Sequence, residues 1–309
     1  MTSVHPPSCP VVVVGGYLGA GKTTLVNHML RHAAGRRVAV LVNDFGTVSI
    51  DASLIEGQGD DGVLAIAGGC MCCAYGEDLV GTLSTVAARR PAPQAILVEC
   101  SGVGLPGAVA RAAALVPAIR VEGVVVLVDA AEIVRLIDDV YVGDTVRQQL
   151  READLLIVNQ SDRVVEEAWP AVDQVLSTWA PRCPRIRCQR AITPPQVLWG
   201  GVGVRRGRRP GAAPSTLLTG GRRHLSDAVA TADARFRHFE TRVERPVDPA
   251  LWIEDFSARH PGLLRAKGWV PGRDGRQWLV QVMGQRHSVQ PDTSNRLGPT
   301  GSVVGICAL

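Results

Sequence analysis

The fold is indicated most clearly by one stretch of the sequence, Val11-Val12-Val13-Val14-Gly15-Gly16-Tyr17-Leu18-Gly19-Ala20-Gly21-Lys22-Thr23-Thr24-Leu25. Its four valines predict a buried strand, residues 16–23 fit the pattern G-x-x-x-x-G-K-[ST], and Thr24 begins a predicted helix. Strand, glycine-rich turn and helix follow in the order that a phosphate-binding P-loop requires, which disfavours a chance Gly-Lys-Thr turn. The sequence therefore predicts a nucleotide site at the start of the chain.

The residue types in this loop have separate physical roles. Its glycines let successive backbone N–H groups converge on phosphate oxygens at a helix N-terminus, where the helix dipole favours negative charge. Lys22 is expected to contact the terminal phosphates, and Thr23 to offer its hydroxyl to Mg²⁺. The chain has only two lysines, Lys22 and Lys267, so a lysine at this position is informative. The nucleotide-binding residues predicted here are Gly16, Gly19, Ala20, Gly21, Lys22, Thr23 and Thr24.

Length and composition restrict the class of protein. A chain of 309 residues with 46% hydrophobic residues can form two domains of about 150 residues each. No apolar stretch approaches the roughly 20 residues of a membrane span, and the N-terminus lacks the pattern of a secretion signal. Eight clustered cysteines do not suit a disulfide scaffold, and a net charge of +4 does not indicate a nucleic-acid partner. We therefore expect a cytoplasmic protein with reduced thiols and no membrane partner.

Strand and helix signals alternate up to about residue 190. Apolar runs of four to six residues separated by helices are typical of a parallel sheet that is covered on both faces. The predicted fold is therefore a doubly wound, mostly parallel α/β domain. Its predicted strands are 11–14, 38–42, 63–67, 95–98, 124–128 and 155–158, and its predicted helices include 77–89, 106–115, 146–151 and 166–179.

Polar loops follow five of these strands, and the carboxyl ends of parallel strands form the edge where ligands bind. Glu99 ends a strand, where its carboxylate can hold Mg²⁺ through water or orient the attacking water; capping the next helix is the alternative. Gly102 could donate its backbone N–H to the terminal phosphate and make its segment a phosphate-sensing switch. The five loops are 16–23, 43–46, 70–73, 99–102 and 159–162.

Three cysteines, Cys70, Cys72 and Cys73, lie within four residues. Their thiolates can supply three positions of a tetrahedral site and leave the fourth open, which suits transfer of a metal ion. Sulfur ligands favour zinc or copper(I) over magnesium, and metal capture should weaken as pH falls because the thiols must lose protons. The alternative is packed cysteines with a redox-active neighbour, but the adjoining Gly68 and Gly69 indicate a loop.

Other side chains could also bind a metal ion. Asp44 follows a strand near the cysteine cluster, and it is either a metal ligand or the cap of a turn. His28 and His32 stand four residues apart on the helix after the P-loop and could hold a metal on one face. For these histidines a solvated helix surface is the favoured interpretation.

Composition changes to Gly, Pro and Arg between Gly200 and Arg223. This segment is interpreted as a flexible linker, with an arm that touches RNA, a ribosome or an acidic partner as the less favoured alternative. We predict a P-loop domain over residues 1–199, a linker over 200–234 and a small α+β domain over 235–309. The last has predicted strands at 236–243, 263–266 and 278–282, a helix at 248–259, and Trp252, Trp269 and Trp278 in its core.

Taken together, these motifs resemble the CobW-like GTPases, a metallochaperone branch of the P-loop proteins related to the nickel-insertion GTPases of urease and hydrogenase maturation. The C-x-C-C element is specific to that family, and the resemblance covers nearly the whole chain. It rests on Gly15–Leu25, Asn43–Gly46 with Ile50-Asp51, Gly69–Cys73, Glu99–Gly102 and Arg265–Gly268.

The resemblance implies GTP hydrolysis coupled to delivery of a divalent metal, most often Zn²⁺ and sometimes Co²⁺, to a metal-requiring client protein. It implies that Asn159 and Asp162 contact the guanine base, that Lys22 and Glu99 serve hydrolysis with Mg²⁺, and that a homodimer is possible. The C-terminal domain would recognise a partner or close over the metal site.

Departures from the family pattern concern the first switch and the base site. Asp44 and Thr47 stand where relatives carry glutamates, which affects the number of metal ligands. Gln160 replaces the lysine of Asn-Lys-x-Asp, although Asp162 can still accept hydrogen bonds from guanine N1 and N2, which adenine does not offer.

Two rival hypotheses belong to other classes. The chain could be a regulatory switch that binds a ribosome or stress factor and reads metal as an occupancy signal. It could also sense oxidants through Cys72 and Cys73.

Overall fold

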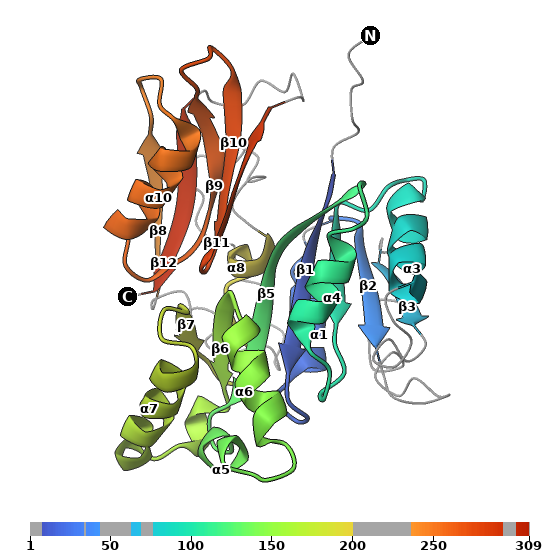
Figure 1. The fold of residues 1–309 in the computed structure, drawn as a ribbon, viewed down its shortest axis with the longest axis vertical. Coiled ribbons are helices and arrows are strands. Elements are labelled where there is room, and N and C mark those ends of the chain that lie inside the picture. Colours follow the sequence, from blue (N-terminus) through green and yellow to red (C-terminus); the bar gives the residue numbers. More distant parts are fainter. Residues whose placement is uncertain are drawn as a thin grey trace, which may run out of the picture.

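The computed structural model describes residues 8–33, 35–43, 63–68, 77–199, 236–292 and 301–308. Its first sheet has seven strands in the order β3-β2-β4-β1-β5-β6-β7, and every neighbouring pair is parallel (Figure 1). The doubly wound α/β fold is thereby confirmed. The strands are β1 (Cys9–Gly16), β2 (Val38–Asn43), β3 (Val63–Gly68), β4 (Ala95–Glu99), β5 (Ile119–Asp129), β6 (Leu155–Asn159) and β7 (Arg185–Arg187).

Alternate residues of β1 enter two different cores, which explains its unbroken run of valines. Val11 and Val13 pack on one face of the sheet, and Val12 and Val14 pack on the other. The second face is covered by α1 (Lys22–Arg31) and α8 (Gln196–Trp199). The first face is covered by α3 (Glu77–Ala88), α4 (Pro106–Ala113), α5 (Ile133–Ile137), α6 (Gly143–Glu152) and α7 (Trp169–Trp179).

A second, antiparallel sheet of five strands follows in the order β11-β10-β9-β12-β8. Asp248 caps the helix α10, since its Oδ1 accepts hydrogen bonds from the backbone N–H groups of Ala250 and Leu251. Ile253 and Phe256 on that helix are buried in the core of the second sheet. The elements are β8 (Phe236–Arg242), α10 (Pro249–Arg259), β9 (Leu263–Pro271), β10 (Gln277–Met283), β11 (Arg286–Pro291) and β12 (Ser302–Ala308).

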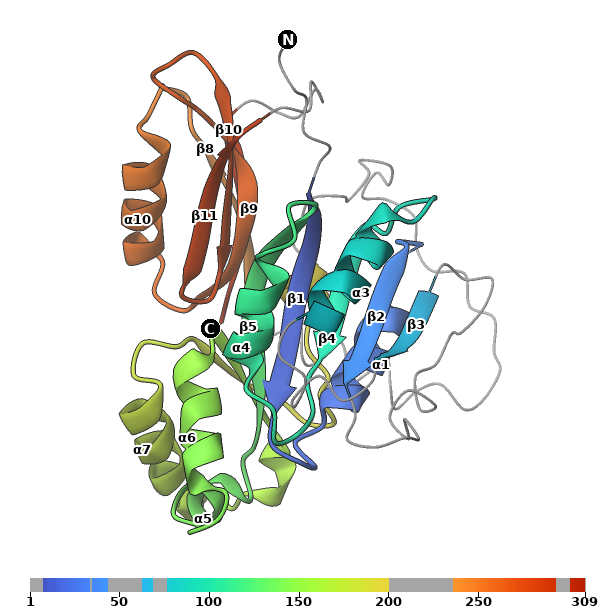
Figure 2. The ribbon, with the colours of Figure 1, turned by 45° about the vertical axis from the view of Figure 1, so that its right-hand side comes forward.

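The two sheets share an apolar core. The C-terminal sheet lies beside β5, with α10 on its far side (Figure 2). Its Leu264, Met283 and Ile306 belong to the same buried cluster as Leu127 and the apolar side chains of α1. Gly123 on β5 permits this approach, because a Cβ there would lie 2.5 Å from the sulfur of Met283.

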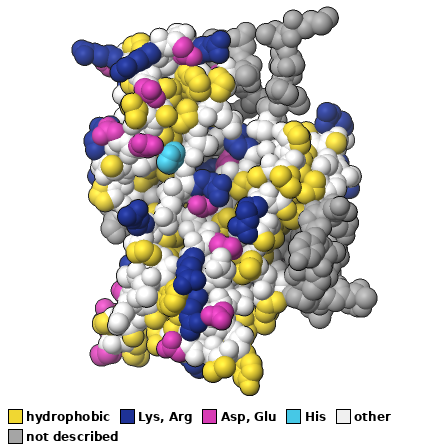
Figure 3. Space-filling model, viewed as in Figure 1, with side chains coloured by type: hydrophobic (Ala, Val, Ile, Leu, Met, Phe, Trp, Pro, Cys, Tyr) yellow, Lys and Arg dark blue, Asp and Glu magenta, His cyan; other side chains and the backbone are white. Residues whose placement is uncertain are grey.

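A buried ionic cluster lies at the same contact. Glu122 on β5 accepts from Arg265 and lies 2.8 Å from Arg120 and 3.7 Å from Lys267 Nζ. Arg265 and Glu122 are 2% and 6% exposed, so the pair is removed from water. In the space-filling view, basic and acidic side chains that reach the surface also lie together near the middle of the molecule (Figure 3). Arg265, from the Arg265–Gly268 motif noted in the sequence, therefore joins the C-terminal sheet to β5 through one carboxylate.

A second polar contact joins the end of α6 to the C-terminal sheet. Asp154 Oδ2 accepts from Arg286 Nε at 2.8 Å, and the Asp154 carbonyl accepts from the backbone N–H of Gln285 at 3.0 Å. Asp154 Oδ2 also accepts from the backbone N–H of Val124 at 2.9 Å. One residue therefore ties α6, β5 and the turn before β11 together.

Replacement of Lys267 by methionine is expected to stabilise the protein, most strongly at and below pH 7. Burial, reinforced by Arg265, Arg120 and Arg36, lowers the pKa of Lys267 from 10.5 to about 7, with Glu122 as its nearby carboxylate. Between about pH 7 and pH 10.5 the Lys267 amine is protonated in the unfolded chain and neutral in the folded protein. The contribution of Lys267 to the free energy of unfolding therefore rises with pH. The advantage of Lys267→Met should shrink from pH 6.5 to pH 9 in urea unfolding, and a pH-independent difference would contradict the assignment.

The described elements agree with most of the sequence predictions. The helix expected over 166–179 begins at Trp169, after two short 3₁₀ turns. Trp252 and Trp278 pack against the C-terminal core as predicted, and Trp269 is half-buried. The strands β7, β11 and β12 and the short helices α5 and α8 were not predicted.

Some predictions lie outside the described residues. The linker over 200–234 and its arginines are among them, so the domain boundaries remain a prediction. Within the described ranges, no helix combines the length and apolarity needed to cross a membrane.

Candidate functional site

The P-loop has the predicted strand, turn and helix. β1 ends at Gly16 and α1 begins at Lys22. Gly16, Gly19 and Gly21 have φ values of 132°, 78° and 102°, a region that favours glycine. A Cβ at Gly21 would lie 2.5 Å from the side-chain nitrogen of Asn159, so the loop packs directly against the end of β6.

Thr23 and Glu99, distant in sequence, meet beside this loop. Thr23 Oγ1 donates a hydrogen bond of 2.6 Å to Glu99 Oε1, and the 1% exposed Glu99 is buried at the end of β4. The capping alternative is wrong, because α4 begins after Leu105 and has no side-chain cap. A hydroxyl and a carboxylate form a hard oxygen donor set, which fits the expected Mg²⁺.

The amine of Lys22 lies within the same group. Its Nζ donates to the carbonyl of Tyr17 at 3.3 Å, and Lys22 is 7% exposed. The lysine is thus folded back over its own loop, where a phosphate would replace the carbonyl as the partner of a charged donor.

Asn159 joins the P-loop to the predicted base site. Its Nδ2 donates to the carbonyl of Ala20 at 2.9 Å, and its Oδ1 accepts from the backbone N–H of Ala191 at 2.8 Å. Asp162 lies three residues further on, exposed in a short 3₁₀ turn, and Gln160 before it has a left-handed φ of 60°. The structure therefore brings Asn159 to the P-loop and leaves the Asp162 carboxylate accessible beside it.

Gly102 lies against the P-loop from the side of β4. A Cβ at Gly102 would stand 2.5 Å from Leu18 Cδ2 and 2.8 Å from the Leu18 backbone nitrogen. Only a hydrogen atom fits in that space, so the segment after β4 is in direct contact with the loop predicted to hold phosphate.

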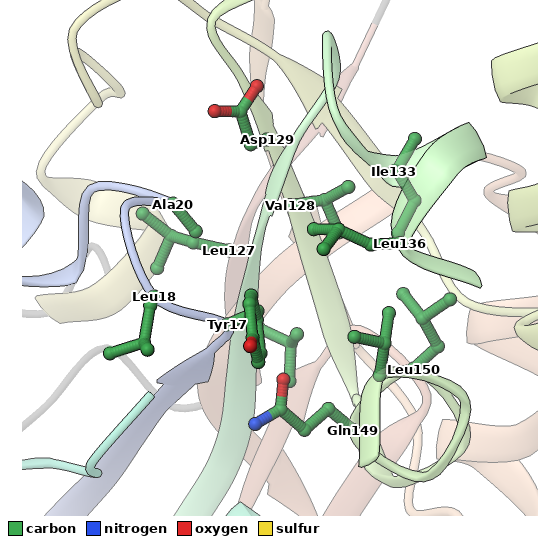
Figure 4. A pocket seen from close by; sticks show the side chains of 12 residues that line it. Tyr17, Leu18, Ala20, Leu127, Val128, Asp129, Ile133, Leu136, Gln149 and Leu150 are labelled. Atoms are coloured by element: carbon green, nitrogen blue, oxygen red, sulfur yellow. The ribbon is translucent and has the colours of Figure 1, made fainter. Parts of the chain in front are cut away.

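Sequence reasoning missed several residues of this site. Tyr17, Asp129 and Gln149 line a small cavity beside the P-loop, where the Tyr17 ring and the Gln149 amide face each other (Figure 4). Asp129 directly follows an apolar strand, the same signal that identified Glu99, and could have been found. Ala191 could not, because its only contribution is a backbone N–H.

The model of the CobW/HypB/UreG nucleotide-binding domain matches residues 10–186, which is more than half of the chain and includes the P-loop, β4 and β6. The chain belongs to this family.

Curated relatives extend the match of this CobW-family protein beyond the nucleotide-binding domain. It is 30% identical to the zinc chaperone CobW of Sinorhizobium sp., over 90% of this chain and 86% of that protein. It is 31% identical to the zinc chaperone CobW of Pseudomonas aeruginosa, over 90% and 81% of the two chains. The resemblance to the CobW-like GTPases is thereby confirmed. The crystal structure of Zn(II)-bound YjiA GTPase from Escherichia coli covers 98% of this chain at 20% identity and a TM-score of 0.42, with 95% of that chain matched.

The predicted metal ligands of the CobW-family chain, Cys70, Cys72, Cys73 and Asp44, lie outside the described residues. The cysteines that the structure does describe are buried. Burial raises the pKa of Cys100 to about 12, so its thiol stays protonated beside Glu99. Within the described part of the chain, no three His, Cys, Asp or Glu side chains are grouped as a metal site would require.

The expectation of a solvated surface is wrong for His28. Its ring is 4% exposed, and Nε2 lies 2.8 Å from the carbonyl of Thr193. Burial lowers the pKa of His28, so the ring is neutral near pH 7 and binds the segment before α8. The His32 ring lies 4.5 Å from it, and Nδ1 of His32 is 2.8 Å from the carbonyl of His28. These contacts give the pair a packing role.

Proposed function

We propose that this CobW-family GTPase binds and hydrolyses GTP and uses that cycle to load and deliver Zn²⁺ to a metal-requiring client protein in the cytoplasm. The observation that carries the proposal is the meeting of Lys22, Thr23 and Glu99 around one P-loop. The relatives from Sinorhizobium sp. and Pseudomonas aeruginosa are zinc chaperones, which supports the choice of metal.

Each residue of the site has a part in this mechanism. Lys22 and the N–H groups of residues 16–24 hold the phosphates, and Gly102 meets the terminal one. Thr23 and Glu99 would hold Mg²⁺, which supplies charge neutralisation on the phosphates, while Glu99 also orients the attacking water. No arginine finger is evident from the sequence, and such groups supply factors of about 10³ to 10⁵ in turnover, so we expect slow intrinsic turnover.

Zinc is the cargo in this proposal. Cys70, Cys72 and Cys73 would hold it through three thiolates, with Asp44 as a further ligand and the fourth position open to the client. Co²⁺ could occupy the same ligands, since affinity alone does not select zinc. The cluster follows β3 in the sequence, and β3 belongs to the parallel sheet whose strand β1 leads into the P-loop.

The proposal is tested by hydrolysis of GTP and ATP with and without one equivalent of Zn²⁺, together with a zinc titration against a competing chelator. Tight zinc binding that changes turnover of GTP but not of ATP supports the coupled mechanism. If nucleotide and zinc do not affect each other, GTP hydrolysis does not drive metal delivery. Zinc-dependent capture of a partner without transfer would then favour the regulatory switch.

Asp162→Ala is expected to reduce the preference for GTP over ATP by about tenfold or more, because two hydrogen bonds to guanine N1 and N2 would be lost. Its carboxylate is exposed, so folding should be unchanged. Competition of GTP and ATP for a fluorescent nucleotide measures the preference. An exposed carboxylate away from the site, changed in Glu167→Ala, is the matched control. Retention of the wild-type preference in Asp162→Ala would show that other atoms read the base.

A further inference from the structure

Gln149 is a buried polar residue that the proposed mechanism does not yet use. It lies on α6, is 2% exposed, and belongs to neither the P-loop nor the strand ends. Its Nε2 donates to the carbonyl of Gly102 at 3.0 Å and to the carbonyl of Gly104 at 2.8 Å. A glutamine amide has two N–H donors, and both are directed at one short segment.

The segment 102–104 contacts α6 on one side and the P-loop on the other. Glu152, one turn after Gln149, accepts a hydrogen bond of 2.8 Å from the backbone N–H of Gly107, at the start of α4. On the other side, Gly102 has room only for a hydrogen atom before Leu18. The helix α6 therefore holds the loop between β4 and α4 at two carbonyls and the start of α4 at one N–H group.

The contacts explain why this position needs an amide. A carboxylate at 149 would bring acceptor oxygens against two carbonyl acceptors, and an aliphatic side chain would leave both carbonyls without their donors. Either change leaves buried polar groups unsatisfied, which is unfavourable. The cost falls on the loop, because α6 itself remains packed through Val146 and Leu150.

We infer that Gln149 is a positioning residue: it sets the backbone of Gly102 in the orientation that distinguishes a nucleoside triphosphate from a diphosphate. The inference rests on the proposed GTPase function and deepens it. Gln149 touches no phosphate in this account; it acts through the two carbonyls that it holds. A terminal phosphate would gain the Gly102 N–H only when the segment is in this position.

The test compares the affinities of Gln149→Leu and wild type for GDP and for a non-hydrolysable GTP analogue, measured with fluorescent nucleotides, alongside kcat and KM for GTP. We expect the affinity for the analogue to fall about tenfold, the affinity for GDP to change by less than about twofold, and kcat to fall more than KM rises. A purely structural role would weaken both nucleotides equally.

Gln174→Leu is the matched control, since it makes the same chemical change at an exposed amide on α7. If Gln149→Leu does not fold, Gln149→Asn keeps the amide on a side chain one methylene shorter, and an analogue-specific loss is expected there too. Equal loss for both nucleotides, or no loss, in the folded variant overturns the inference. Failure of the wild type to bind guanine nucleotides appears in the wild-type arm and refutes the GTPase proposal itself.

Discussion

Lys22→Met should abolish measurable GTP hydrolysis while leaving zinc binding within about twofold of wild type. The ammonium is the only charged side chain that the P-loop pattern supplies to the terminal phosphates, and loss of one such electrostatic group costs about 10²–10³ in turnover. Zinc affinity should persist because the predicted thiolates are separate from the phosphate cradle. Release of phosphate and competition of zinc with a chelator are the two measurements.

The chain provides its own control for this experiment. Lys267 is the only other lysine, and it lies in the ionic cluster around Glu122 at the far end of β5. Lys267→Met makes the same chemical change and should leave turnover near the wild-type value. A folded Lys22→Met protein that still hydrolyses GTP at the wild-type rate would remove Lys22 from the mechanism. The reverse variant, Cys72→Ala, should lose zinc and keep basal hydrolysis.

Glu99→Gln is expected to lower GTP turnover about 10²–10³-fold with little change in GDP affinity. The amide has the shape of the carboxylate and can still accept the hydrogen bond from Thr23, so the fold should be retained. It lacks the negative charge that would hold Mg²⁺ or align the attacking water. Single-turnover hydrolysis at several Mg²⁺ concentrations separates these two roles, because only weakened metal binding is overcome by excess Mg²⁺.

The matched control is Glu132→Gln. This change removes the charge of the carboxylate that pairs with Arg135, and Glu132 does not belong to the P-loop. Its turnover should equal that of wild type. Unchanged turnover in Glu99→Gln would mean that another group positions the water or the metal, and Asp129 at the end of β5, which lines the cavity beside the P-loop, is a candidate.

Residues whose role depends on local pattern could be predicted from the sequence. Unbroken valines gave the parallel strands, and a polar residue at the end of such a strand located Glu99 and Asn159. These signals work because the carboxyl ends of parallel strands share one edge, whatever the details of packing. The ranges of β1, β4 and β6 confirm this reasoning.

Roles created by tertiary contact could not be predicted. His28 has the spacing of a surface pair with His32, and nothing in the neighbouring residues reveals that Thr193 covers it. Gln149 lies in a run of polar residues on α6, and its function appears only when Gly102 and Gly104 are placed beside it. β11 likewise has a weak strand signal, since none of its residues is fully buried and its sequence is mostly polar.

The shared core has a practical consequence for making chimeras. Leu264, Met283 and Ile306 cover apolar side chains of the parallel sheet, so a P-loop domain cut off at the linker would carry a bare apolar surface and should aggregate. A C-terminal sheet grafted from a relative must supply matching apolar groups and a basic partner for Glu122. A chimera should therefore exchange the C-terminal sheet together with the apolar surface that it covers. A boundary chosen from sequence composition alone would separate that sheet from that surface.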